Sequence, residues 1–291
     1  MRPGRDNIGP IRQALVGMLP ARGTVDLTEH YDKISEAARL VRHDSLRDLA
    51  PLQAAHAVVD EIRLWREILG ARPEASIFDQ IVSGLELGLF ALVSGLYRQA
   101  YGSLRLAVEL TAGVCWFSTH RLDLAEWQSG ERDLIWKEIT NDDEGVLSPR
   151  FRKAFFPELS EERKYNGLNK KLYRELSEYV HGNARTWAGP DDIKYDEQLH
   201  RAWFEKLDTY MVVTTVLLSL RYLQEVGDGA VEKLAPNLHS RVGHVSAITK
   251  YLEERLPTPA AATEPAPSAA AGAQATATPL APGMNGAQET N

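Results

Sequence analysis

The chain has 291 residues, of which 44% are hydrophobic and 25% are charged, a mix typical of a globular protein with a packed core. Its formal net charge of −7 excludes a protein that coats nucleic acid with its whole surface, so any such contact requires a local basic patch. The single cysteine, Cys115, excludes a disulfide framework and lies in an apolar stretch typical of a core. We see no signal peptide, and no apolar window reaches the roughly 20 residues of a membrane span. We therefore expect a cytoplasmic protein without a membrane contact.

Helical periodicity predicts helices over most of the chain before residue 257. The first 50 residues are expected to form an N-terminal helical extension, with a helix over 28–49. The next helix, 51–70, has Pro51 in its first turn and stops at a glycine. Helices are then expected over 76–94 and 97–120. The second of these is apolar on nearly every side, which predicts a place in the middle of a bundle.

The second half of the chain continues the helical pattern. We expect an amphipathic helix over 123–140, a loop over 141–148, and helices over 160–182, 196–226 and 238–256. No long window alternates as a half-buried strand would, so no sheet is predicted. The sequence therefore predicts an all-α fold with a multi-helix up-and-down bundle over residues 51–256. The Ala-, Pro- and Thr-rich residues 257–291 cannot bury enough apolar surface to offset chain entropy, and we expect a disordered tail.

One segment near residue 180 carries the side chains best suited to chemistry. It reads KKLYRELSEYVHG over residues 170–182, and a helical wheel separates two faces. The face expected in the core consists of Leu172, Tyr173, Leu176, Tyr179 and Val180. The polar stripe expected to point away from that core consists of Lys170, Arg174, Ser177 and His181.

Arg174 and His181 are seven residues apart, which is two turns and about 10.5 Å of helical rise. A long guanidinium side chain and an imidazole can converge across that gap on one bound group. Ser177 lies between them, and its hydroxyl could orient the imidazole ring. Gly182 is suited to terminate the helix, which would put His181 in the last turn, where the helix dipole favours the protonated ring.

This pattern of Arg, six residues and His, late on a bundle helix, resembles the HEPN superfamily of bacterial helical proteins. The signature of that superfamily is Arg, four to six residues, then His. The run GLYRQAYGSLRLAVEL over residues 95–110 is similar to the "QA…LR…E" helix of several HEPN-like families. The resemblance covers roughly residues 77–226. It implies a metal-independent endoribonuclease of a toxin–antitoxin or anti-phage defence system, in which two copies pair as a homodimer and both motifs line one cleft.

The chemistry implied by the resemblance assigns roles to these residues. A 2′-hydroxyl of RNA would attack the adjacent phosphate, with His181 as general acid or base near neutral pH. Arg174 would form a bidentate hydrogen bond with the phosphate oxygens, and the hydroxyl of Ser177 would assist Arg174 and His181. Further contacts with phosphate or base could come from Lys170, Arg98, Asn183 and Arg185, and from stacking on Trp187.

Two features depart from active members of the superfamily. Glu175 follows the arginine, where such members often carry Asn, Asp or His, and the six-residue spacing is the longest that the signature allows. Glu178 lies four residues after Arg174 and could hold it in a salt bridge. The alternative is therefore a catalytically silent HEPN-like module that binds an antitoxin, a partner defence protein or a nucleotide. A third reading is a regulatory bundle that binds a small apolar ligand.

The apolar helix over 97–120 also carries Arg98, Arg105 and Glu109 on one side. A buried charge must be paired, and Arg105 and Glu109 are spaced to pair with each other. Arg98 could reach the region of His181 or belong to an internal ion pair. The chain contains no HExxH, Walker loop, GxGxxG or metal-spaced Cys/His cluster, so we expect no metal or cofactor.

Overall fold

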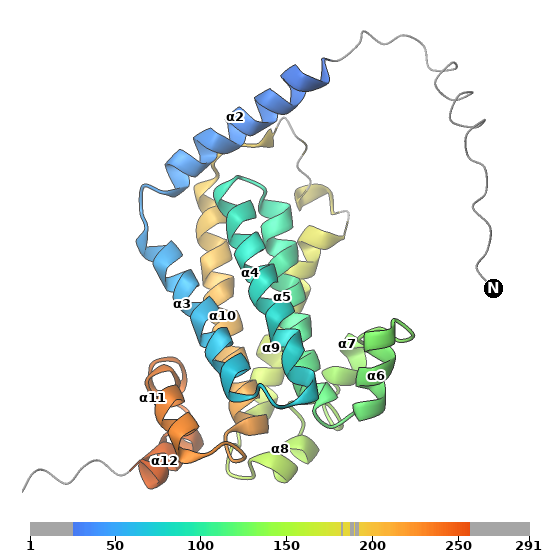
Figure 1. Ribbon diagram of the computed structural model, residues 1–291, viewed down its shortest axis with the longest axis vertical. Coiled ribbons are helices and arrows are strands. Elements are labelled where there is room, and N and C mark those ends of the chain that lie inside the picture. Colours follow the sequence, from blue (N-terminus) through green and yellow to red (C-terminus); the bar gives the residue numbers. More distant parts are fainter. Residues whose placement is uncertain (1–25, 182, 187–188, 190–191, 257–291) are drawn as a thin grey trace, which may run out of the picture. The chain divides into compact units, whose positions relative to one another are not determined.

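The computed structural model describes residues 26–181, 183–186, 189 and 192–256 (Figure 1). Residue contacts divide the chain into two units, Met1–Leu256 and Pro257–Asn291. The expected tail over 257–291, and residues 1–25 of the expected extension, lie outside the described residues. The described residues form eleven α-helices and two short 3₁₀ helices, with no strand among them. The predicted all-α fold is therefore confirmed.

The first four long helices follow the predicted order. They are α2 (Leu27–Ser45), α3 (Ala50–Ile68), α4 (Ile77–Val93) and α5 (Tyr97–Phe117), and the 3₁₀ helix η1 (Pro73–Ser76) precedes α4. Asp26 caps α2, because its carboxylate accepts hydrogen bonds from the backbone N–H groups of Thr28 and Glu29. Pro51 lies in the first turn of α3, where its missing N–H has no cost.

The middle of the chain differs from the prediction in two ways. The expected helix over 123–140 is two helices, α6 (Arg121–Ser129) and α7 (Trp136–Ile139). Gly130 ends α6 in the left-handed conformation, with φ of 76°, which glycine adopts without steric cost. The expected loop is followed by an unpredicted helix, α8 (Pro149–Phe155), which Ser148 caps by accepting a hydrogen bond from the N–H of Phe151.

The last part of the described chain begins with α9 (Glu162–Val180), the 3₁₀ helix η2 (Ala184–Thr186) and α10 (Glu197–Tyr222). The helix expected over 238–256 is instead two helices, α11 (Asp228–Val242) and α12 (Ser246–Arg255). The break falls at Val245, whose backbone is extended, with φ of −89° and ψ of 99°. The helical pattern after residue 226 therefore starts earlier than expected and is interrupted.

The core forms around α5, which packs against α4, α9 and α10 (Figure 1). Tyr101, Leu104 and Val114 are fully buried on this helix, and Cys115 is buried as expected. Each large apolar side chain removed from water contributes about 1.5–3 kcal/mol, so α5 is central to the stability of the bundle. On α2, Val41 reaches the bundle near Gly95, because a Cβ at Gly95 would lie 3.1 Å from a Val41 methyl group.

One helical stretch of the described chain, Pro73–Val93, is long and apolar enough to cross a membrane by length and composition alone. In its most apolar window, 44% of the residues are buried inside the bundle. A core helix meets the same criteria, so this stretch is weak evidence for a membrane span.

Candidate functional site

The candidate site lies at the C-terminal end of α9. Leu172 and Leu176 face the core as expected and fix the rotation of this helix. Arg174 and His181 are separated by nearly two full turns, so they lie on one side of α9, and both are exposed. The helix ends at Val180, and His181 is its C-cap, with an extended backbone and its N–H bonded to the Ser177 carbonyl. His181 therefore follows the last turn and does not lie within it.

The side chain of Arg174 forms no ion pair with any of the described residues. Glu178, its expected salt-bridge partner, instead accepts a hydrogen bond from the side-chain amide of Asn183. Glu175 is also engaged elsewhere, because its carboxylate lies 2.5 Å from the ammonium of Lys206 on α10. The guanidinium of Arg174 is thus not held by either neighbouring carboxylate.

Ser177 does not lie on the exposed stripe, contrary to the expectation from the helical wheel. Only 9% of its surface is exposed, and its hydroxyl donates to the carbonyl of Tyr173 at 2.7 Å. The same hydroxyl accepts a hydrogen bond from Nε of Arg105 at 3.0 Å. Ser177 therefore connects α9 to α5 and does not orient the ring of His181. The helical wheel could not predict this burial, because the partner of Ser177, Arg105, belongs to another helix.

The charged side chains of α5 form a part-buried cluster against α9. Arg105 lies 3.1 Å from the carboxylate of Glu109, which confirms the predicted pair. The hydroxyl of Tyr173 bonds to both groups, and the guanidinium lies 4.5 Å from the centre of the Tyr173 ring. Trp136 stacks on the ring of Tyr173, with the two ring centres 4.0 Å apart. Tyr173, expected simply in the core, is thus the centre of a polar and aromatic contact.

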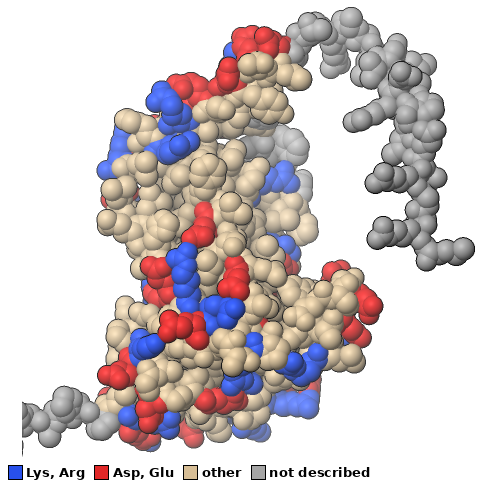
Figure 2. Space-filling model, in the orientation of Figure 1, with Lys and Arg blue, Asp and Glu red and all other residues tan. Residues whose placement is uncertain are grey.

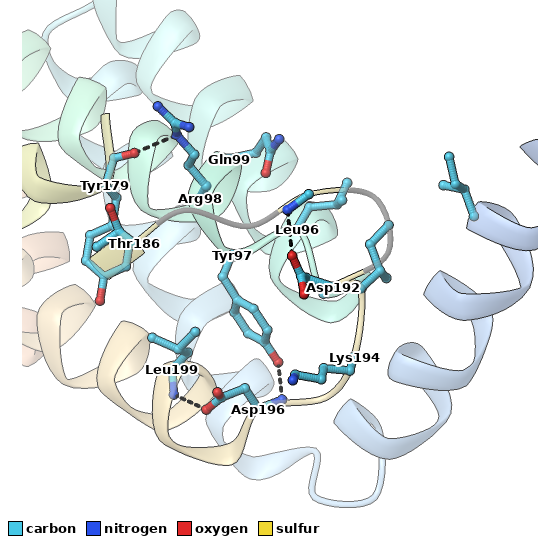
Figure 3. A pocket seen from close by; sticks show the side chains of 14 residues that line it. Leu96, Tyr97, Arg98, Gln99, Tyr179, Thr186, Asp192, Lys194, Asp196 and Leu199 are labelled. Carbon is cyan, nitrogen blue, oxygen red and sulfur yellow. Dashed lines mark hydrogen bonds between the residues drawn. The ribbon is translucent and has the colours of Figure 1, made fainter. Parts of the chain in front are cut away.

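Arg98 reaches the region of His181, one of the two placements considered from the sequence. Its Nε donates to the carbonyl of Tyr179 at 2.8 Å (Figure 3). Its Nη2 donates to the carbonyl of Val180 at 3.0 Å. These carbonyls belong to the last turn of α9, where the helix dipole places partial negative charge. Arg98 therefore fixes the helix end that carries His181. Val180, expected in the core, is 38% exposed.

Of the other four residues expected to contact RNA, two are paired with carboxylates of the chain, and the side chains of the other two are not described. Lys170 lies 2.7 Å from Asp142, and this hydrogen bond lowers the pKa of the Asp142 carboxyl below its ordinary value. Its charge is thus balanced within the chain. The side-chain amide of Asn183 donates a hydrogen bond to Glu178. The side chain of Arg185 lies outside the described part of the chain. Trp187 lies outside the described residues.

Within the described ranges there is no group of three or more His, Cys, Asp or Glu side chains that could hold a metal ion. No protein-family model matches the chain, and neither the curated proteins nor the solved structures contain a match to it. The arguments about function therefore depend on the residues of α9 and their surroundings.

Proposed function

We propose that the protein is a metal-independent endoribonuclease of a toxin–antitoxin or anti-phage defence system. The observation that carries this proposal is the exposed pair of Arg174 and His181 on one side of α9. Both side chains can reach a phosphodiester from solvent, and Arg174 has no competing ion pair among the described residues.

The chemistry of the two groups suits RNA cleavage by internal attack. The imidazole of His181 is a group that can take the proton of a 2′-hydroxyl and give a proton to the leaving oxygen. The 2′-oxygen attacks phosphorus as its proton passes to the imidazole, the bond to the 5′-oxygen breaks, and the leaving 5′-oxygen receives a proton from the imidazole, so that a 2′,3′-cyclic phosphate and a 5′-hydroxyl form. Arg174 stabilises the charge that develops on the phosphate oxygens. Arg98 has a positioning role, because it holds the helix end on which His181 lies.

Arg174 and His181 are exposed, and a second copy of the chain packed beside them would form a cleft around the RNA. An apolar surface near His181 supports such pairing: Leu87 and Phe90 of α4 and Leu106 of α5 are 66%, 58% and 46% exposed. Val180 is close to this surface, since a Cβ at Gly102 would lie 3.8 Å from its methyl group. Figure 2 shows few charged side chains over the upper half of α4 and α5.

Expression in a bacterial host tests the proposal at the level of the cell. Wild-type protein is expected to arrest growth and fragment cellular RNA, whereas His181→Ala is expected to do neither. His239→Ala is the matched control, because His239 is also exposed but lies on α11. Normal growth with intact RNA at high levels of wild-type protein would reject the proposal.

The alternative is a catalytically silent helical module that binds a partner protein of a defence or stress system. Two contacts favour it: Ser177 is bonded to Arg105 and not to His181, as support of catalysis would require, and Lys170 pairs with Asp142, although it was expected to bind phosphate. In this case His181→Ala would leave co-purification of the partner unchanged, and RNA would stay intact with either protein.

A further inference from the structure

A cavity of about 480 Å³ lies where α2, the start of α5, the end of α9 and the segment before α10 meet (Figure 3). Sites for small molecules in proteins commonly have about 300–1,000 Å³. The apolar part of its wall is made by Ile34, Leu96, Tyr97, Tyr179, Ile193 and Leu199. Neither Arg174 nor His181 lines it.

Two tyrosines give this cavity a defined shape. The ring of Tyr179 is fixed by stacking on Tyr101, with ring centres 3.8 Å apart and planes within 6°. The hydroxyl of Tyr97 accepts a hydrogen bond from the N–H of Asp196 at 2.8 Å (Figure 3). Among the described residues, none accepts the proton of this hydroxyl, so a ligand in the cavity can accept it. Burial raises the pKa of the Tyr97 hydroxyl, so it remains a donor at neutral pH.

Among the described residues that line the cavity, the charged groups balance in sign. Asp192 and Asp196 are opposed by Arg98 and Lys194, and each carboxylate already accepts a backbone N–H, from Gly189 and Leu199 respectively (Figure 3). The Arg98 guanidinium is engaged with the end of α9, and Lys194 is exposed to water. A charged ligand placed against the apolar wall would lose its hydration without a dedicated counter-ion.

From this combination we propose that the cavity binds an uncharged small molecule with an aromatic ring, held by apolar contact and a hydrogen bond from Tyr97. The proposal does not depend on ribonuclease activity, and its test has a separate readout. A ligand here would contact both α2 and the end of α9, and so would connect the N-terminal helix to the helix that carries His181.

The test uses the full chain and two fluorescent probes with one ring skeleton. 6-Propionyl-2-(dimethylamino)naphthalene is uncharged, and its ketone oxygen can accept a hydrogen bond, whereas 1-anilinonaphthalene-8-sulfonate carries a negative charge. We expect saturable fluorescence enhancement at one site by the uncharged probe, with weaker binding of the sulfonate. Tyr97→Phe should weaken binding of the uncharged probe by about threefold to tenfold, the effect of one hydrogen bond.

A matched pair of substitutions on α2 locates the site. Ile34→Trp places an indole at the cavity wall and should weaken binding by about tenfold or more, whereas Leu40→Trp, at an exposed position of the same helix, should change it by less than about twofold. Far-UV circular dichroism and thermal unfolding establish that both variants are folded. Absence of saturable binding, equal effects of the two substitutions, or tighter binding of the sulfonate would overturn the proposal.

Discussion

Arg98 and Arg105 lie on the same side of α5, yet they bind different kinds of group. Arg105 is held by the carboxylate of Glu109 and the hydroxyls of Ser177 and Tyr173, so its charge is balanced inside the contact between two helices. Arg98 has backbone carbonyls of α9 as partners. The pairing of Arg105 with Glu109 was predictable from their spacing. The partners of both arginines on α9 could not be predicted, because local sequence spacing does not indicate which helices pack together.

Replacing Arg105 by Ala should lower the free energy of unfolding by about 2 kcal/mol, because it leaves Glu109 part-buried without its partner. Glu109→Gln in the same chain should recover part of this loss, since the uncompensated charge is removed. Urea unfolding of the two single variants and the double variant measures the coupling. Additive effects of the two substitutions would contradict the assigned pair.

His200 on α10 should make the stability depend on pH. It is only 7% exposed, packs near Phe204 and Tyr195, and burial lowers the pKa of its ring. The unfolded chain therefore binds the proton more readily, and stability present above an ordinary pKa of about 6.5 is lost as pH falls below it.

His200→Phe should reduce the loss of unfolding free energy between pH 7 and pH 5, whereas His239→Phe, at an exposed position, should not. Urea unfolding at pH 5, 6 and 7 measures this slope. An unchanged slope in His200→Phe would contradict a buried neutral imidazole.

At the scale of elements, the periodic pattern located the long helices well and their interruptions poorly. The bounds of α3, α4 and α5 were predicted closely, because apolar spacing, Pro51 and Gly70 mark them directly. The breaks after Ser129 and at Val245 were missed, although the polar run SGERD over residues 129–133 marks the first of them. On α9, a wheel predicts only average directions, so it misplaced Ser177 and Val180 while placing Leu172 and Leu176 correctly.

The same substitution at two glycines should have opposite effects. A methyl group would meet no atom within 4 Å at either Gly130 or Gly167. Gly130 has a φ of 76°, so Gly130→Ala should destabilise the fold by about 1–2 kcal/mol. Gly167 lies inside α9, so Gly167→Ala should stabilise it by about 0.5–1 kcal/mol. Thermal unfolding measures both signs, and a lower midpoint for Gly167→Ala would contradict the assigned helix.

At the scale of the whole molecule, the exposed apolar side chains of α4 and α5 bear on assembly. A single chain gains nothing from leaving Leu87 and Phe90 in water, and large exposed apolar patches often mark interfaces. A second copy covering this surface would place another chain near Val180 and His181. The sequence suggested pairing only through its resemblance to the HEPN superfamily, because exposure of these residues depends on the packing of the bundle.

We expect the wild-type chain to be a dimer in light scattering after gel filtration, and Phe90→Glu to be a folded monomer. A carboxylate at this position would have to be desolvated in the interface. Leu122→Glu is the control, because Leu122 is 70% exposed on α6. A monomeric wild type, or equal dissociation by both substitutions, would contradict a dimer formed through α4 and α5.

Cleavage of RNA by the purified protein in the presence of a chelator is the most direct test of the proposed chemistry. Wild-type protein should produce fragments that end in 2′,3′-cyclic phosphate. His181→Ala and Arg174→Ala should lose this activity by about 100-fold or more, while His239→Ala and Arg201→Ala keep it. RNA left intact by the wild type, or cleaved equally by His181→Ala, would contradict the role given to the exposed arginine and histidine of α9.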